Sequence, residues 1–325
     1  MTRGSWLVAR LPSRSSLRIV SEGWRLATAT LLFTLTANAP AQAALTEGPR
    51  LAAIYDSILN ARFDRAGTLL KEACPPAPVE ACQVLDVVSS WWRIQINPAD
   101  RSRDERFVAQ AAAATKAAEA WTIREPQRGE AWFYLAASYA PLVQWQVLRG
   151  ERLAAARNGS RIKRALERTV ELDPTIIDAH FGIGLYEYYA DVASSAAKIL
   201  RWLLLLPGGD RVNGLREMLR VRREGEILRG EADFQLSVIY VWYEHQTERA
   251  LELLTSLDAR YPANPIFLER SAETYETYLH DPRMSAAVWR TLIDRARSDR
   301  VYDAAQTLTR AEIKLRALTT RYKLF

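Results

Sequence analysis

The spacing of histidines, serines and carboxylates decides whether this chain of 325 residues could catalyse a reaction or bind a metal ion. The three histidines are His180, His245 and His280, and none of them belongs to a His-Glu-x-x-His sequence or another spacing that holds zinc. No Gly-x-Ser-x-Gly sequence supplies an activated serine. Carboxylates are frequent, but no pair stands out as a general acid and base. The sequence therefore predicts no catalytic residue, no metal site and no cofactor, and it gives no support to an enzyme.

Aromatic side chains are abundant instead, with 10 Trp and 13 Tyr. Some of them fall at regular core positions, which leaves others that could line a binding face. Aromatic residues are enriched where proteins bind partners, although most aromatic side chains pack inside a fold. The candidate binding residues, for which both interpretations stay open, are Trp91, Trp145, Tyr186, Tyr188, Tyr189, Trp242 and Tyr243.

The two cysteines, Cys74 and Cys82, flank a proline-rich segment, residues 75–78. They lie between a helix pair expected within residues 49–74 and a helix expected over residues 79–96. Two thiols with no histidine nearby make a poor zinc site. In an exported chain, two thiols on either side of such a turn predict a disulfide; two separate buried thiols are the alternative.

Residues 129–174 have the strongest helical pattern in the chain. On the first helix, spacings of 3, 1 and 3 form one apolar stripe from Trp132, Leu135, Ala136 and Tyr139. Such spacings place side chains on one face of an α-helix. The stripe of the second helix consists of Ile162, Leu166, Thr169 and Val170. Pro174 ends the second helix because proline cannot continue the backbone hydrogen bonds and disfavours helix at the residue before it.

This helix pair resembles the tetratricopeptide repeat, in which a Trp, a Leu followed by a small residue, and a Tyr mark the first helix and a Pro closes the second. The matching residues are Trp132, Leu135, Ala136, Tyr139, Leu166 and Pro174. Ile162 and Thr169 replace small residues of the pattern. An insert, residues 141–160, is expected between the two helices. The basic run over residues 149–164 is interpreted as a solvated helix face.

Weaker copies of the repeat follow to residue 297. Pro262 closes a pair of helices expected over residues 231–243 and 247–261, with Phe234 at the Trp position. In the copy before it, His180 takes the Trp position and is expected to be a packed side chain. The resemblance implies an all-α fold, a tetratricopeptide-like solenoid of stacked helical hairpins. It says little about function, because one fold hosts many roles.

Other helices are expected between and after these copies. An apolar run predicts a buried helix over residues 193–206. Asp210 or Asn213 then caps a helix that is expected to reach Arg229. A last helix, with apolar positions from residue 301 to 318, is predicted to cover the exposed end of the array, which repeat proteins require.

Residues 1–43 have the pattern of a secretory signal peptide. The uncharged run over residues 26–37 is too short to span a bilayer, which takes about 20 residues. Ala41-Gln42-Ala43 supplies the small residues that a signal peptidase recognises. The repeat domain is therefore expected over residues 44–325, exported to the periplasm or cell envelope, with no integral membrane segment after cleavage. An uncleaved anchor is the alternative.

The net charge of +6 and the pI near 9.4 are a weak argument for nucleic-acid binding. Residues 1–43 contain five Arg and one Glu, so they carry most of that charge and leave about +2 for the remainder. Strong nucleic-acid binding rests on many phosphate contacts from basic residues. We therefore expect no nucleic-acid partner.

Taken together, the repeats and the signal peptide predict an exported, non-enzymatic scaffold that binds a protein or peptide partner on its concave face. The alternative is a helical enzyme or binding protein that acts on envelope glycans. Glycan hydrolysis would need two carboxylates across a cleft.

Overall fold

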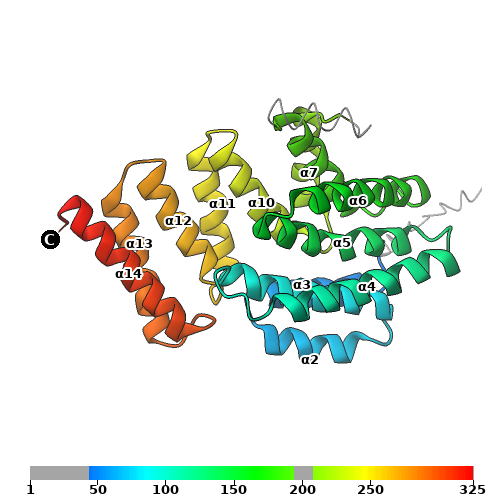
Figure 1. The fold of residues 1–325 in the computed structure, drawn as a ribbon, viewed down its shortest axis with the longest axis horizontal. Helices are drawn as coiled ribbons and strands as arrows, with labels where there is room; N and C mark the ends of the chain where they lie inside the picture. Colours follow the sequence, from blue (N-terminus) through cyan, green and yellow to red (C-terminus); the bar gives the residue numbers. More distant parts are fainter. Residues whose placement is uncertain (1–43, 194–207, 325) are drawn as a thin grey trace, which may run out of the picture. The chain divides into compact units, whose positions relative to one another are not determined.

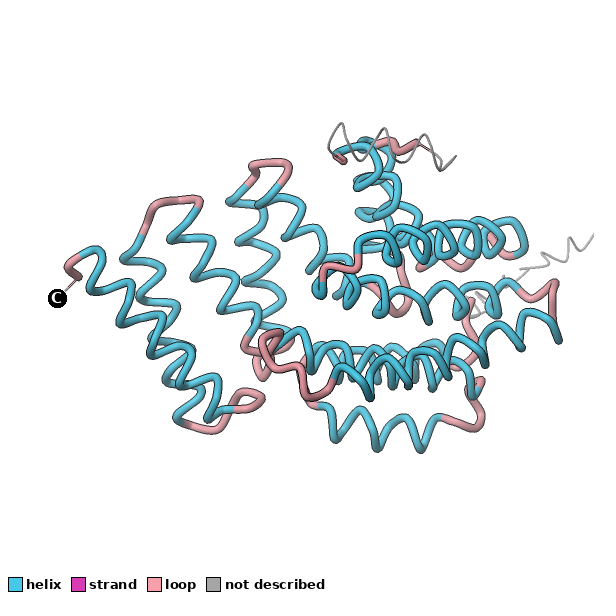
Figure 2. Tube along the Cα trace, in the orientation of Figure 1, coloured by secondary structure: helices cyan, strands magenta, loops and turns pink. Residues whose placement is uncertain are grey.

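Helices joined by short connections make up most of the computed structural model, which describes residues 44–193 and 208–324 (Figure 1). No strand occurs in these described residues, so the all-α prediction is confirmed (Figure 2). The helices are α1 (Gly48–Leu59), α2 (Phe63–Ala73), α3 (Val79–Ile96), α4 (Asp104–Arg124), α5 (Gly129–Arg149), α6 (Arg152–Leu172), α7 (Ala179–Val192), α9 (Arg211–Glu224), α10 (Arg229–Trp242), α11 (Thr247–Arg260), α12 (Ile266–Thr277), α13 (Pro282–Arg297) and α14 (Ala304–Tyr322).

Most helices pack against their neighbours in chain order. The most extensive contacts are those of α5 with α6, α7 with α9, α10 with α11, and α13 with both α12 and α14. The contacts continue from one pair to the next, since α6 packs against α7, α9 against α10 and α11 against α12, as is expected for stacked helical hairpins. Pro174 and Pro262 follow the ends of α6 and α11, as the sequence predicts, and Phe234 is buried. The signal-peptide residues and the buried helix predicted over residues 193–206 lie outside the described residues, apart from Ala193.

The first helices also contact helices far along the chain. The Trp92 ring on α3 packs against Phe234 and Phe267, with ring centroids 5.3 Å and 6.3 Å away. The Tyr55 hydroxyl on α1 donates to the buried carboxylate of Glu231 on α10 at 3.0 Å. One core therefore joins the N-terminal helices to α10 and α12, beyond the neighbour contacts that define a simple repeat array.

The insert predicted between the two anchor helices is wrong. Helix α5 continues through Pro141 to Arg149, and α6 begins at Arg152, so residues 141–160 lengthen both helices. Proline removes one N–H donor from the helix, which here does not end it. Gly150 ends α5, because its φ of 84° is left-handed backbone that glycine adopts without steric cost.

The pair α7 and α9 crosses at two glycines. A Cβ on Gly184 would lie 2.7 Å from the backbone oxygen of Gly214, and one on Gly214 would lie 2.6 Å from the oxygen of Gly184. A larger residue at either position would push the helices apart. Asp210 caps α9 as predicted, since its side chain accepts the Asn213 N–H at 2.9 Å.

Helix α9 ends at Glu224, five residues before the predicted end. The backbone N–H groups of Glu226, Ile227 and Leu228 all donate to the Asp178 carboxylate, at 2.7, 3.1 and 2.7 Å. These three bonds stabilise the turn that leads into α10, so the chain leaves the helix there.

Helix α14 covers the C-terminal end of the packed helices, as predicted. Ala311 and Leu318 are buried in one cluster with Trp289 and Leu292 of α13. On its other face Ile313 is exposed, together with several polar and charged residues. Within the part of the chain that is described, no helix combines the length and the apolar character needed to cross a bilayer.

Candidate functional site

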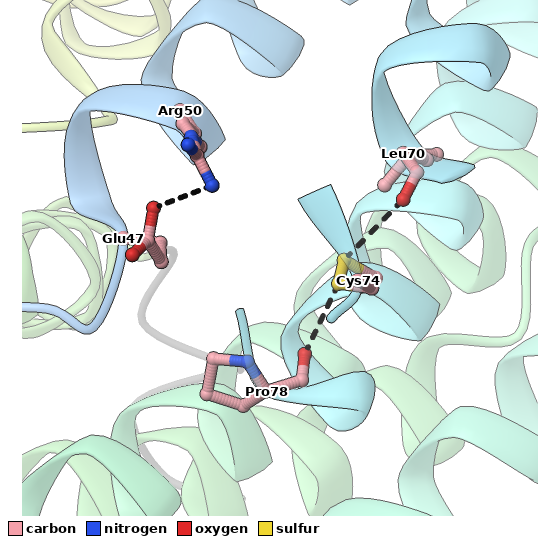
Figure 3. The surroundings of a disulfide bond; sticks show 6 residues. Glu47, Arg50, Leu70, Cys74 and Pro78 are labelled. Carbon is pink, nitrogen blue, oxygen red and sulfur yellow. Dashed lines mark hydrogen bonds and ion pairs between the residues drawn. A yellow bond between two sulfur atoms is a disulfide. The ribbon is translucent and has the colours of Figure 1, made fainter. Parts of the chain in front are cut away.

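The two cysteines join the end of α2 to the start of α3. Their Cα atoms are 6.5 Å apart and their sulfur atoms lie at bonding distance, so the structure places the predicted pair as a disulfide requires (Figure 3). Sγ of Cys74 also lies 3.5 Å from the carbonyl oxygen of Pro78. The described residues contain no group of three or more His, Cys, Asp and Glu side chains that could hold a metal ion.

Three of the predicted aromatic residues come together where α7 and α10 end. Tyr188, Tyr189 and Tyr243 pack edge to face, with ring centroids 5.6 to 6.0 Å apart. The Tyr188 hydroxyl donates to Glu244 at 2.5 Å, and Arg211 donates to the same carboxylate at 2.7 Å. Burial, followed by the neighbouring carboxylate, raises the pKa of Tyr188. This arrangement stabilises the junction of α7, α9 and α10.

The other predicted aromatic residues lie elsewhere. Trp91 and Trp145 flank the ring of Phe107, at centroid distances of 6.1 and 6.2 Å, and the Lys163 ammonium lies 5.6 Å above the Tyr186 ring. Among the seven candidate binding residues, only Trp242 exposes more than half of its surface, at 52%. Trp91 and Tyr188 are buried, so their rings are not accessible to a partner. That the accessible rings bind a partner stays a prediction.

A cleft of about 660 Å³ lies over α3 and is bordered by α2 on one side and by α4 on the other. This volume is within the range of known ligand pockets. We call it the α2–α4 cleft, and its lining residues are Phe63, Asp64, Gly67, Thr68, Lys71, Asp86, Ser89, Ser90, Arg93, Arg103, Arg106, Phe107 and Gln110.

Basic side chains dominate the charge of the α2–α4 cleft, with four cations against two carboxylates. Lys71, Arg103 and Arg106 are exposed, and no carboxylate among the described residues lies within ion-pair distance of them. Free arginine and lysine side chains are the groups that recognise carboxylates and phosphates. The cleft is therefore suited to an anionic ligand.

Arg93 is the cleft cation that other side chains hold in place. Its guanidinium carbon lies 4.3 Å from the centroid of the Phe63 ring, and it donates to the Tyr302 hydroxyl at 3.3 Å. It also lies 3.7 Å from a carboxylate oxygen of Asp64, which faces solvent. The contact with Phe63 and the hydrogen bond to Tyr302 hold the guanidinium in place, so less entropy is lost when it binds an anion.

The acidic side of the cleft is occupied by an internal hydrogen-bond network. Gln110 donates to Asp86 and accepts from the Ser90 hydroxyl, the latter at 2.7 Å. The two lining rings, Phe63 and Phe107, are only 4% and 1% exposed, so they offer no face on which a sugar could stack. These features do not favour the glycan-binding alternative.

Gly67 leaves part of the α2 wall without a side chain. It lies in the middle of α2, and no atom lies within 4 Å of the position where a Cβ would stand. Glycine inside a helix costs about 0.5–1 kcal/mol relative to alanine. Packing does not require glycine at this position. Because Gly67 has no side chain, the cleft is wider here than it would be with a larger residue.

Sequence reasoning missed this cleft, although a local signal exists. Asp64, Gly67, Thr68 and Lys71 follow one face of α2 at spacings of 3, 1 and 3. On the other side, Arg106 and Gln110 of α4 are spaced by 4, and Arg103 directly precedes α4, three residues before Arg106. Each series looks like an ordinary solvated face. Only the packing of both helices against α3 brings the two faces together.

Comparisons with known proteins do not identify a family or a function: no protein-family model matches the chain, and a search of curated proteins finds no significant relative.

Proposed function

We propose that this chain is an exported, non-enzymatic tetratricopeptide-like scaffold that binds an acidic peptide segment of a partner protein in the α2–α4 cleft. The single observation that carries the proposal is the set of exposed, unpaired basic side chains on both walls of the cleft, Lys71 on one side and Arg103 and Arg106 on the other. Arginine and lysine contribute both attraction and orientation toward carboxylates.

The dimensions of α2 set the length of the segment. With 11 residues, α2 is about 16 Å long at 1.5 Å per residue. An extended peptide advances about 3.3 Å per residue. A segment of about five residues would therefore run along the cleft, with its carboxylates within reach of the cations on either wall.

The compartment is part of the same proposal. The signal-peptide pattern of residues 1–43 supports export, and the cysteine pair supports an oxidising compartment such as the periplasm. The tetratricopeptide assignment rests on the repeat pattern and on the chain-order packing of helical hairpins. The role is that of an adaptor that presents a partner.

Fluorescence anisotropy with labelled five-residue peptides tests the binding. We expect a glutamate-rich peptide to bind and a lysine-rich peptide of the same length to show no binding. Affinity should fall with added salt, because the contacts are exposed charges. Equal affinity for the two peptides would contradict the proposal.

Charge reversal then locates the site. Arg103→Glu with Arg106→Glu should lower the affinity for the acidic peptide at least 10-fold. The matched control reverses two exposed arginines on α6, Arg152→Glu with Arg157→Glu, and should leave the affinity within about two-fold, since these residues lie outside the cleft. Equal losses in both double variants would show that only the total charge matters.

A further inference from the structure

Three carboxylates from distant parts of the chain meet beside the start of the described chain. Glu130 comes from α5, Asp178 precedes α7, and Glu226 lies in the turn between α9 and α10. Glu130 and Asp178 are 5% and 2% exposed, and Glu226 is half-buried. Negative charge gathered in a poorly hydrated place needs compensation by cations or hydrogen-bond donors.

A buried hydroxyl without a partner lies beside these carboxylates. Tyr134 is 1% exposed, and in the described part of the chain its Oη has no hydrogen-bond partner. Burial, together with the charges of Glu130, Asp178 and Glu226, raises the pKa of Tyr134. A buried hydroxyl is nearly always hydrogen-bonded, so one without a partner indicates a missing donor or acceptor.

The chain enters the described fold on top of this cluster. The Leu45 N–H donates to Oε2 of Glu226 at 3.4 Å, and the Thr46 N–H donates to Oε1 of Glu130 at 2.9 Å. Leu45 is 1% exposed, so the segment is held in place by burial as well. Ala44 therefore directly precedes the backbone N–H that contacts Glu226.

Glu130 has an ion-pair partner, whereas Glu226 has none among the described residues. Arg128 pairs with Glu130 at 2.7 Å and also with Glu125 at 2.9 Å. Arg229 influences Asp178 and Glu226 electrostatically, but its guanidinium donates to the carbonyl of Gly225. For Glu226, burial comes first and repulsion from Asp178 and Glu130 second in raising its pKa.

We propose that proteolytic cleavage between Ala43 and Ala44 creates an α-ammonium on Ala44 that binds in this cluster, paired with Glu226 and close to the Tyr134 hydroxyl. In the cleavage, water adds across the Ala43–Ala44 peptide bond; the C–N bond breaks, Ala43 keeps a carboxylate and Ala44 gains the ammonium. Successive residues are about 3.8 Å apart, so the new nitrogen lies within about 4 Å of the Leu45 nitrogen that already contacts Glu226. The cluster is thus a binding site for the chain's own processed N-terminus.

The inference uses the signal-peptide expectation and is independent of the α2–α4 cleft. Pairing of the new ammonium with Glu226 would make the processed chain more stable than the precursor, which cleavage alone would not do. The amide nitrogen of the uncleaved chain carries no charge, whereas the ammonium is a cation with three donors. The processed form is therefore expected to be more stable than the precursor, by about 10-fold or more in the folding equilibrium constant, which is the usual effect of a hydrogen bond to a charged group.

The first test uses the full chain produced in an exporting bacterial host. Mass spectrometry of the purified protein should find Ala44 as the first residue. The pKa of its α-amine, measured by NMR, should lie above the usual range of about 7.7–8.0, because neighbouring carboxylates favour the charged form. A different first residue, or an amine pKa within that range, would overturn the proposal without affecting the proposed cleft function.

The second test is a cycle of two changes on the processed protein. Acetylation of the Ala44 amine should lower the folding equilibrium constant about 10-fold at pH 7. In Glu226→Gln the same acetylation should have a smaller effect, while in Glu105→Gln, an exposed control on α4, it should keep its full effect. An acetylation effect that is absent, or equal in both variants, would contradict pairing with Glu226.

Discussion

The guanidinium of Arg93 lies 4.3 Å from the centre of the Phe63 ring, which fixes a cation in the α2–α4 cleft before any ligand arrives. We expect Arg93→Ala to weaken binding of the acidic peptide 10-fold or more and to lower the free energy of unfolding by about 0.5–1 kcal/mol through loss of the cation–π contact. Arg93→Lys should retain part of the binding, since lysine keeps the charge without the planar guanidinium. Anisotropy titration and urea unfolding measure the two effects. Unchanged affinity in Arg93→Ala would remove this residue from the site.

Substitutions at Gly67 separate effects on stability from effects on peptide binding. Gly67→Ala should raise the free energy of unfolding by about 0.5–1 kcal/mol, because alanine favours helix and no neighbour would be displaced. Gly67→Glu should nearly abolish binding of the acidic peptide, since it adds bulk and negative charge to the cleft wall. Urea unfolding and anisotropy on the same samples check both expectations. Normal peptide affinity in a folded Gly67→Glu protein would mean that the peptide binds elsewhere.

The cysteine pair is expected to stabilise the α2–α3 junction. Reduction, or Cys74→Ser with Cys82→Ser, should cost about 2–3 kcal/mol, the entropy term for so short a loop. Mass spectrometry of the unreduced protein, alkylated in denaturant so that buried thiols also react, should show no labelled cysteine. Two labelled thiols in protein isolated from the envelope would instead support independent buried thiols.

The environment of His180 is expected to make the free energy of unfolding depend on pH. Its Nδ1 lies 2.7 Å from Oε2 of Glu217, yet burial, helped by Arg220, outweighs this carboxylate and lowers the pKa of His180. The unfolded chain then takes up the proton first, so stability is lost as pH falls below about 6.5. The stability difference between His180→Gln and the unchanged protein should therefore vary between pH 8 and pH 5.

Urea midpoints at several pH values measure that difference. The matched control for the loss of a histidine is His245→Gln, a change at an exposed position. Parallel curves for the unchanged protein and His180→Gln would show that His180 does not contribute to the pH dependence.

Local signals in the sequence predicted most of the helices. Pro174 and Pro262 mark helix ends through their own backbone chemistry, and Asp210 caps α9 through an oxygen three residues from its partner. Each of these effects acts within one or two helical turns. The insert predicted over residues 141–160 does not occur, because a proline inside a helix removes only one hydrogen bond, whereas Gly150 adopts the backbone that ends α5.

The sites depend on packing between distant residues, which a single sequence does not reveal. Leu45 and Glu226 are 181 positions apart, and nothing in their local sequence pairs them. Lys71 and Arg106 face one cleft only because α2 and α4 both pack on α3. Conversely, residue type alone predicts Tyr188 and Tyr189 as binding residues, whereas in the structure Tyr188 packs against both Tyr189 and Tyr243 where α7 and α10 meet.

The most direct test of the proposed function is to map where a bound acidic peptide lies. A glutamate-rich five-residue peptide with a photoreactive benzoylphenylalanine at one end is irradiated with the purified protein, and the linked residues are identified by mass spectrometry. We expect links to α2 and to the first turns of α4, and fewer of them in Arg103→Glu with Arg106→Glu. Links concentrated near Trp242 and Tyr243, unaffected by that change, would contradict it.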